Sequence, residues 1–278
     1  MSTAFAYREQ YASPPLTDWI RKFWVLDNGR NPAPVLNKNV LPNSCFNLAY
    51  VTGEGLLIHN RRGPLAMPAA SYFCGQARGS VDVVIQPHTH VTMVQLHPWA
   101  LAVLTSHSLA GTADAIEPLA DLLPELAPLH LPSYTLPEVP RGEEAVVRLM
   151  ETKLPSLAQP TAPASLLHRA CQRLQQAKGC LGIAELAQEL ACSTRAVEKH
   201  FKHGLGLTPK EFTTVLRVRG VVDTLQAPGQ RQPLAQVALE YGFYDQAHFI
   251  HAFRRLVRQS PSKFNVADYL LPVTGTGY

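Results

Sequence analysis

The segment HTHVTMVQ is the one place in the sequence where a metal-binding pattern suggests itself. His88 and His90 lie two residues apart, so on a strand their imidazoles share one face, and Gln95 follows. Enzymes that bind a catalytic metal with paired histidines add a carboxylate, and an amide stands in that place here. Polar residues at a strand end are the simpler interpretation. We therefore predict no metal, no cofactor and no catalytic residue in this chain.

Two later segments carry donor side chains at helical spacing. In the first, Ala196, Val197 and Phe201 can face a core, and the opposite face carries Arg195, Glu198, Lys199 and Lys202. In the second, the apolar residues are Phe249, Phe253 and Leu256, and the outward residues are Gln246, Ala247, His248, His251 and Arg255. Arg and Lys reach guanine edges in the DNA major groove, and Gln pairs with adenine. For either helix alone, a solvated surface explains the pattern equally well.

The charge distribution favours DNA for this part of the chain. Up to residue 160 there are 11 Lys and Arg against 13 Asp and Glu, and afterwards 14 against 8. The second part is therefore cationic within a chain whose net charge is only +4.

An internal repeat places both donor faces in the same kind of unit. The positions of Ile183, Ala187, Leu190 and Cys192 recur 51 residues later as Leu234, Ala238, Tyr241 and Phe243. Those of Val197, Phe201, Thr208, Pro209 and Phe212 recur 52 residues later as Phe249, Phe253, Ser260, Pro261 and Phe264. Each copy reads as a short helix, a tight turn, a second helix and a capped third, which is the shape of a helix-turn-helix. The helix predicted at 209–226 connects the two copies and would be about 27 Å long. It could hold the two DNA-reading helices close to one turn of DNA apart, a distance of about 34 Å.

The helix limits follow from apolar spacing and capping residues. Thr208, Pro209 and Glu211 form a capping box with a proline start, Asp245 is a helix N-cap, and Gly204 and Gly242 are placed where helices stop. We predict helices at 166–178, 182–190, 194–203, 209–226, 234–241, 246–257 and 261–270.

The first part of the chain reads as β-rich. Apolar and β-branched runs start at Trp19, Cys45, Ser80 and Val91, separated by Gly, Pro and Asn, which favours an antiparallel sandwich or barrel. Helices are expected at 99–109 and 143–153. Of 23 prolines, 18 lie at or before Pro163, and the Pro-rich run 152–165 reads as an extended linker.

Aromatic residues of the β-rich part could line a ligand cavity, although core packing explains them more simply. The candidate effector-binding residues are Trp24, Phe46, Tyr72, His88 and His90. The five cysteines have no CxxC spacing and are read as reduced core thiols. No run is long and apolar enough to span a membrane and the first residues lack a signal peptide, so we expect a cytoplasmic protein.

The C-terminal part, from about residue 166 to 269, resembles the AraC/XylS family of bacterial transcription regulators. The specific stretch is A-x-x-x-G-F-x-D-Q-x-H-F-x-x-A-F-R-R followed by S-P-x-x-F, within LAQVALEYGFYDQAHFIHAFRRLVRQSPSKF. The resemblance implies two helix-turn-helix units joined by a long helix, with base contacts at Arg195, Glu198 and Lys199 and at Gln246, Ala247, His248 and His251. Ala247 and Glu198 are weak groove contacts, so no base preference carries over. More loosely, VLPNSCFNLAY and MVQLHPWALAVL look like the cupin-like sensor domains of such regulators.

We therefore predict an α+β chain of two domains. Residues 1–155 form a β-rich, cupin-like or jelly-roll sensor or oligomerisation domain, 156–164 a linker, and 165–271 an all-α double helix-turn-helix. The predicted function is sequence-specific transcription regulation, with double-stranded DNA as partner. A small-molecule effector, a homodimer and, for an activator, RNA polymerase are further candidate partners, and no membrane is expected. Two alternatives stay open: a cupin-type metal-dependent enzyme fused to a DNA-binding tail, and a first domain that serves only assembly.

Overall fold

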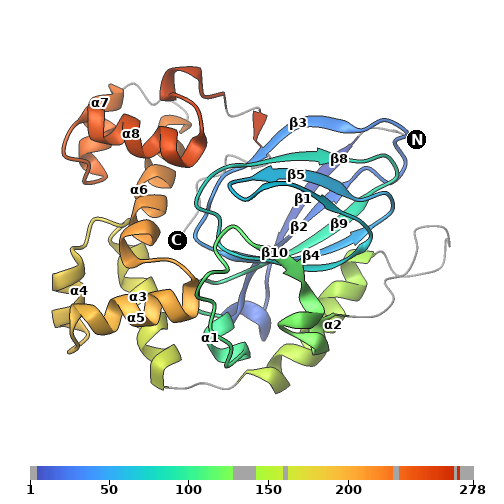
Figure 1. Ribbon diagram of the computed structural model, residues 1–278, viewed down its shortest axis with the longest axis horizontal. Coiled ribbons are helices and arrows are strands. Elements are labelled where there is room, and N and C mark those ends of the chain that lie inside the picture. The colour runs from blue at the N-terminus through green and yellow to red at the C-terminus, as the bar shows by residue number, and fades with distance from the viewer. Residues whose placement is uncertain (1–4, 128–141, 159–161, 228–231, 266–267, 270–278) are drawn as a thin grey trace.

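The computed structural model describes residues 5–127, 142–158, 162–227, 232–265 and 268–269. The first part forms two antiparallel sheets packed face to face (Figure 1). One sheet has the order β1 (Ala6–Tyr11), β2 (Ile20–Asp27), β9 (His90–Leu96), β4 (Phe46–Thr52), β7 (Ala70–Cys74) and β10 (Ile116–Pro118). The other has the order β3 (Val35–Val40), β8 (Val81–Ile85), β5 (Leu56–Asn60) and β6 (Gly63–Met67). The predicted β-rich, jelly-roll-type domain is confirmed.

The central strand β4 is apolar on both faces because it is covered on both sides. Ala49 and Val51 point into the sandwich and join one core cluster with residues of the smaller sheet. Phe46 and Leu48 point the other way, into a second cluster formed with helices. Side chains alternate along a strand, so one strand supplies both cores.

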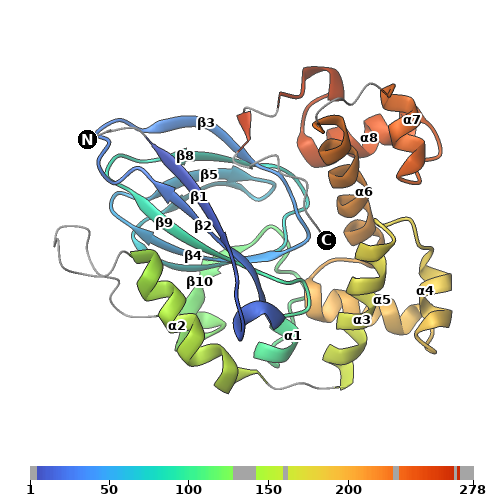
Figure 2. The same cartoon turned by 180° about the vertical axis from the view of Figure 1, so that it is seen from behind.

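Helices cover the outer face of the six-stranded sheet (Figure 2). They are α1 (Leu101–Leu104), α2 (Gly142–Leu157) and short 3-10 turns at Leu16–Asp18, Leu119–Asp121 and Pro124–Leu126. Tyr50 of β4 donates its hydroxyl to the carbonyl of Leu126 at 2.7 Å, which ties this layer to the sheet.

The second part is helical, as predicted. Its helices are α3 (Ala162–Gln176), α4 (Ile183–Glu189), α5 (Thr194–Leu205), α6 (Pro209–Leu225), α7 (Leu234–Glu240) and α8 (Gln246–Val257), followed by a 3-10 turn at Pro261–Lys263. The capping box is present: Thr208 Oγ1 accepts from the Glu211 N–H at 3.2 Å, and Glu211 accepts from the Thr208 N–H at 2.8 Å. Helices α4 and α5 form the first helix-turn-helix unit, and α7 and α8 the second.

Three predictions of local structure, one linker and two helices, were wrong because tertiary contacts override local signals. The expected extended linker is largely helical, since Leu154 is fully buried and keeps α2 helical past Pro155 to Leu157. The helix expected at 99–109 ends at Leu104, where Thr105 becomes extended. In place of the helix predicted at 261–270, the described residues of that range form a 3-10 turn at Pro261–Lys263, and Tyr269 forms a bridge with Asn39 of β3.

Gly204 does not end a helix as predicted. Helix α5 continues to Leu205, and Gly206 adopts the left-handed φ of 70° that closes it. Gly204 is buried instead, where an added Cβ would lie 2.5 Å from Leu167 Cδ2 of α3. Gly242 does end α7 as predicted, with φ of 71°.

The two helix-turn-helix units stand differently against the first domain. One continuous core cluster runs from Phe46 of the sheet to Phe201 of α5. The second unit has a cluster of its own around Phe249 and Phe253, to which Leu41 of the first domain is added. Among the described residues, no helix is both long and apolar enough to cross a bilayer.

Candidate nucleic-acid interface

Helix α5 presents its predicted donor face to solvent. Ser193 caps its start by accepting from the Ala196 N–H at 3.1 Å. Val197 and Phe201 are fully buried, so the helix cannot rotate about its axis without losing core contacts. The opposite face is exposed and consists of Arg195, Glu198, Lys199 and Lys202.

Lys202 already has a partner within its own helix end. Its Nζ donates to the Gly206 carbonyl at 3.4 Å, where a cation is favourable because carbonyls at a helix C-terminus lack partners. Lys202 therefore lies at the C-terminal edge of the exposed face, while Arg195 and Lys199 lie nearer the start of the helix.

Helix α8 repeats this arrangement. Asp245 caps it by accepting from the His248 N–H at 2.7 Å, and Phe249 and Phe253 are buried. The exposed face consists of Gln246, Ala247, His248, His251 and Arg255. The His248 ring meets the Phe243 ring edge-on at 5.4 Å, and its Nδ1 accepts from the Tyr244 N–H at 3.4 Å. This orders the His248 ring beside the turn.

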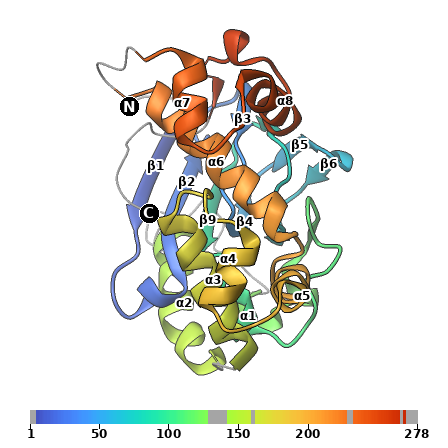
Figure 3. The same ribbon diagram turned by 90° about the vertical axis from the view of Figure 1, so that its left-hand side faces the viewer.

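The two exposed helices are nearly parallel. Both run across Figure 1, and both are seen end-on in Figure 3. Between them lies α6, whose 17 residues span about 25 Å at about 1.5 Å per residue. The C-terminal ends of α5 and α8 lie against the first domain, so their N-terminal ends point away from it.

Arg217 of α6 links the two units, a role that its sequence position did not reveal. Its Nε donates to the Gly179 carbonyl at 2.6 Å and its Nη1 to the Gly242 carbonyl at 3.2 Å. Both glycines have positive φ and sit in the turns beside α4 and α8. The sequence analysis also did not single out Tyr244, a large aromatic side chain that is 86% exposed in the turn before α8, beside the exposed face of that helix. A large aromatic residue preceding an N-cap was the available signal.

The candidate effector residues do not converge on one cavity. A cavity of about 100 Å³ lies inside the sandwich and is lined by Trp24, Asn47 and Met93 among others. Phe46 is on the opposite face of the sheet and does not line this cavity. Tyr72 packs against the inner cluster, and its hydroxyl donates to the Pro68 carbonyl at 2.9 Å. This cavity is smaller than the roughly 300 Å³ at which ligand pockets begin.

His88 and His90 do not share a strand face. His88 is exposed in a turn with φ of 52°, before the strand begins. His90 is buried beside the start of α2, and its Nδ1 lies 3.9 Å from Asp27 Oδ1. This contact and the Gly29 N–H hold the pKa of the Asp27 carboxyl well below its usual range. Gln95 is five residues on and so on the other face. The predicted face-sharing is therefore wrong, and the described residues contain no His, Cys, Asp or Glu cluster suited to a metal.

A larger groove lies between the first domain and the first helix-turn-helix unit. Its volume is about 610 Å³, with an apolar floor and a rim of histidines. Its lining includes Leu104, Leu157, Leu167, His107, His200 and His203. Burial, with Lys199 and His203 nearby, lowers the pKa of His200.

The cysteines are free, as expected, but one of them is not a core thiol. Cys45 and Cys171 are buried, and burial raises the pKa of both thiols. Cys180 is exposed in the turn before α4, which corrects its assignment to the core.

Comparison with known families decides what these helices are. Residues 186–266 match the family described as Helix-turn-helix domain. The C-terminal part is an AraC-type helix-turn-helix domain. Residues 8–117 match a domain of unknown function, DUF6597. The AraC-type domain therefore follows a separate domain whose family carries no assigned role.

Relatives of known sequence match about a third of the chain. An uncharacterized HTH-type transcriptional regulator of Haemophilus influenzae is 33% identical over 92 residues, 33% of this chain and 30% of that protein. The probable transcriptional regulator LumQ of Photobacterium leiognathi is 33% identical over 84 residues, 30% of this chain and 33% of that protein. The chain thus matches about a third of the length of these relatives.

Among solved structures, ToxT from Vibrio cholerae resembles the whole chain weakly. The TM-score is 0.48 at 10% identity, and the match covers 87% of this chain and 97% of ToxT. At this score the likeness supports no conclusion about function.

Proposed function

We propose that this chain is a sequence-specific DNA-binding transcription regulator that places α5 and α8 in successive major grooves. The observation that carries the proposal is the pair of capped, nearly parallel helices, each with a polar face exposed and an aromatic core behind it. In helix-turn-helix proteins the N-terminal residues of the reading helix contact base edges. Here those ends point away from the first domain, so DNA can approach them.

The exposed residues divide into two roles under this proposal. Arg195, Lys199 and Gln246 are long donors near the helix starts and would read base edges. Lys202 and Arg255 lie nearer the helix ends and would contact phosphates, which supply affinity without sequence information. His248 and His251 add donors to the second reading face, and Glu198 and Ala247 complete the two faces without strong contacts.

The first domain is proposed as the regulatory part of the molecule. We place a small-molecule effector in the groove of about 610 Å³, because His200 and His203 on its rim belong to α5 itself. A ligand there would act by its different affinity for two positions of that helix. A homodimer, RNA polymerase as partner of an activator, and action in the cytoplasm complete the proposal. We propose no catalytic role.

The test compares the two helices on DNA selected from random sequence by the purified chain. Arg195→Ala should weaken binding to the selected site by about 1 to 3 kcal/mol and spare random DNA. Gln246→Ala should do the same at the other half of the site, about 10 base pairs away. The matched control is Lys202→Ala, which should weaken all sequences similarly and lower the salt dependence by about one ion.

Two outcomes would reject this function. One is the absence of any selected sequence for the wild-type chain. The other is equal loss on all sequences for Arg195→Ala and Gln246→Ala together, which would make both phosphate contacts. The alternative of a cupin-type enzyme predicts a stoichiometric metal in the purified protein. The pattern that suggested it is weakened because His88 and His90 do not share a strand face.

A further inference from the structure

Both reading helices receive a hydrogen bond from the first domain in their last turn. In α5, the His203 carbonyl accepts from the Leu109 N–H at 2.7 Å. In α8, the Leu256 carbonyl accepts from the Ser80 N–H at 2.7 Å. The last four carbonyls of a helix have no partner within it. The first domain therefore caps the C-terminal ends of both helices.

Each cap has additional contacts that hold it in place. At α8, Ser80 Oγ donates to the Val257 carbonyl at 3.1 Å, and Arg258 Nη1 lies 3.1 Å from Asp82 Oδ2. Arg258 is itself the left-handed residue that ends α8, with φ of 67°. At α5, an added Cβ on Gly206 would lie 2.6 Å from the Leu109 carbonyl oxygen, so only glycine allows this approach.

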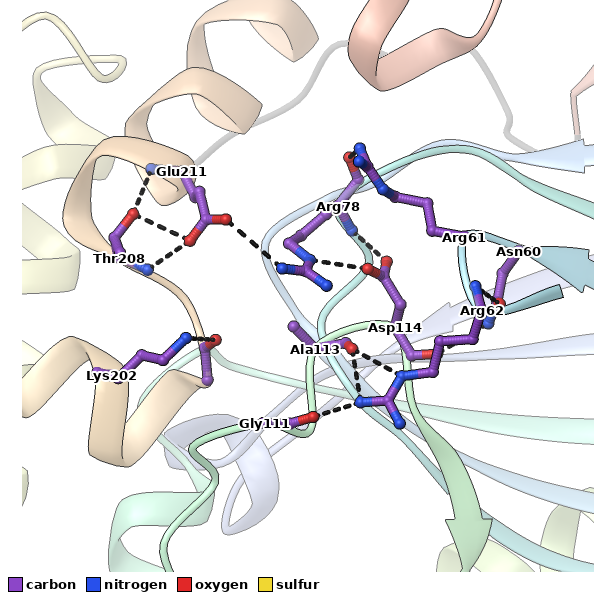
Figure 4. A network of polar contacts seen from close by, with 11 residues as sticks. Asn60, Arg61, Arg62, Arg78, Gly111, Ala113, Asp114, Lys202, Thr208 and Glu211 are labelled. Carbon is purple, nitrogen blue, oxygen red and sulfur yellow. Dashed lines mark hydrogen bonds and ion pairs between the residues drawn. The ribbon is translucent and has the colours of Figure 1, made fainter.

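The two capping segments are joined to each other (Figure 4). Asp114, whose side chain is 1% exposed, accepts from the Arg78 backbone N–H at 2.7 Å and from Arg78 Nε at 2.8 Å. Arg62 donates to the carbonyls of Gly111 and Ala113. We call residues 76–82 and 109–115 together the bracket. A bidentate contact to a buried carboxylate makes the bracket one unit rather than two independent loops.

Few other contacts with the first domain position the second unit. Among the described residues, the buried core cluster of that unit includes Leu41 alone from the first domain, together with Tyr269. Helix α6 packs against α8 within this cluster, and the contacts of Ser80 and Asp82 add polar positioning at the C-terminal end of α8. Arg78 also faces Glu211 of the α6 capping box at 3.8 Å, so the bracket touches the connecting helix as well.

We propose that the bracket sets the distance between α5 and α8, so that the protein selects DNA by the spacing of two half-sites as well as by their sequence. The proposal rests on the DNA-binding function above. One base pair more or less moves a half-site by about 3.4 Å and turns it by about 35°. If α5 and α8 are held rigidly, the protein binds such sites weakly. If their spacing can vary, it binds them nearly as well as the original site. The bracket also borders the sandwich cavity, since Asp114 and Ala115 line it.

The experiment uses the full chain on the selected site and on versions with one or two base pairs added to or removed from its centre. The wild type should bind best at one spacing. Ser80→Ala with Asp82→Asn should lose about threefold to tenfold at that spacing and lose less at the others, giving a flatter profile. Arg258→Gly should flatten the profile too, and it is compatible with folding because glycine suits a left-handed cap. The control is Ser13→Ala with Asp121→Asn, both exposed and outside the bracket.

The outcomes separate this proposal from the one on which it rests. A flattened profile for both bracket variants, with the control unchanged, supports the bracket. An unchanged profile, or an equal loss at every spacing and on an isolated half-site, overturns it while the DNA-binding function stands. A wild type that selects no sequence overturns both.

Discussion

The two helix-turn-helix units repeat the same apolar pattern but are stabilised by different surroundings. In the first unit, Phe201 belongs to a cluster that continues through α3 into the outer face of the six-stranded sheet. In the second unit, Phe253 belongs to a smaller cluster around α6, α7 and α8. Local sequence thus builds two similar units, while the neighbouring domain makes one of them part of a larger core.

This difference predicts unequal stability for the two units. The first unit cannot unfold without exposing apolar surface of the first domain, whereas the second can open while the rest stays folded. The second unit then depends more on its polar contacts with the first domain.

The largest expected effect comes from removing one buried ring in each unit. Phe201→Ala should destabilise the first unit and the first domain together by about 3 to 5 kcal/mol. Phe253→Ala should cost a similar amount but confine it to the second unit. The 3 tryptophans, Trp19, Trp24 and Trp99, all lie in the first domain, and Trp99 stacks on His168 of α3, so their fluorescence reports that domain and its contact with α3 but not the second unit. An equal shift of the tryptophan transition in both variants would contradict the comparison.

Two buried glycines give a smaller effect of the same kind. Gly220 of α6 faces the Tyr241 ring so closely that an added Cβ would overlap it, and Gly220→Ala should cost up to about 3 kcal/mol in the second unit. Gly204→Ala meets only the flexible end of Leu167, and alanine favours helix, so its cost should be about 1 kcal/mol or less. Thermal unfolding followed by helix signal measures both. The reverse order would contradict the close contact between Gly220 and the Tyr241 ring.

Acid should weaken the contact of α3 with the first domain. His97 stacks on Trp99, and Trp99 stacks on His168 of α3, at ring distances of 4.6 and 4.1 Å. Burial lowers the pKa of His97 to about 4, and burial also lowers the pKa of His168.

The sign of this effect follows from proton uptake. Below about pH 6.5 the unfolded chain binds a proton that the folded His97 does not, so stability falls as pH drops from about 6.5 toward 4. His97→Phe keeps a stacking ring without a titrating group and should flatten that part of the pH profile of the tryptophan transition. An unchanged slope in the variant would exclude His97 as its source.

Much of the helical part could be predicted from the sequence. The limits of α8, the start of α5 and the capping box at Thr208 followed from cap residues and apolar spacing, which are local interactions. The exposed donor faces followed from the same spacing, since the buried aromatic residues leave only one orientation for each helix.

The errors fall where distant residues decide. Phe46 and Trp24 are both aromatic residues on strands, and only the packing of helices against one face of the sheet separates the outer core from the cavity. The spacing of His88 and His90 suggests a pair on one strand face, but His88 lies in a turn with left-handed φ before the strand begins. The helix predicted from residue 261 is a 3-10 turn at Pro261–Lys263, and Tyr269 pairs with β3 instead.

The repeat, the helix caps and the residues on the exposed faces of the two units follow from local sequence. These depend on contacts within a few turns of helix. That the first domain caps the last turn of both α5 and α8 depends on the tertiary fold, because Leu109 and Ser80 make those contacts through backbone N–H groups. Every residue except proline carries that group, so no side-chain pattern could announce it.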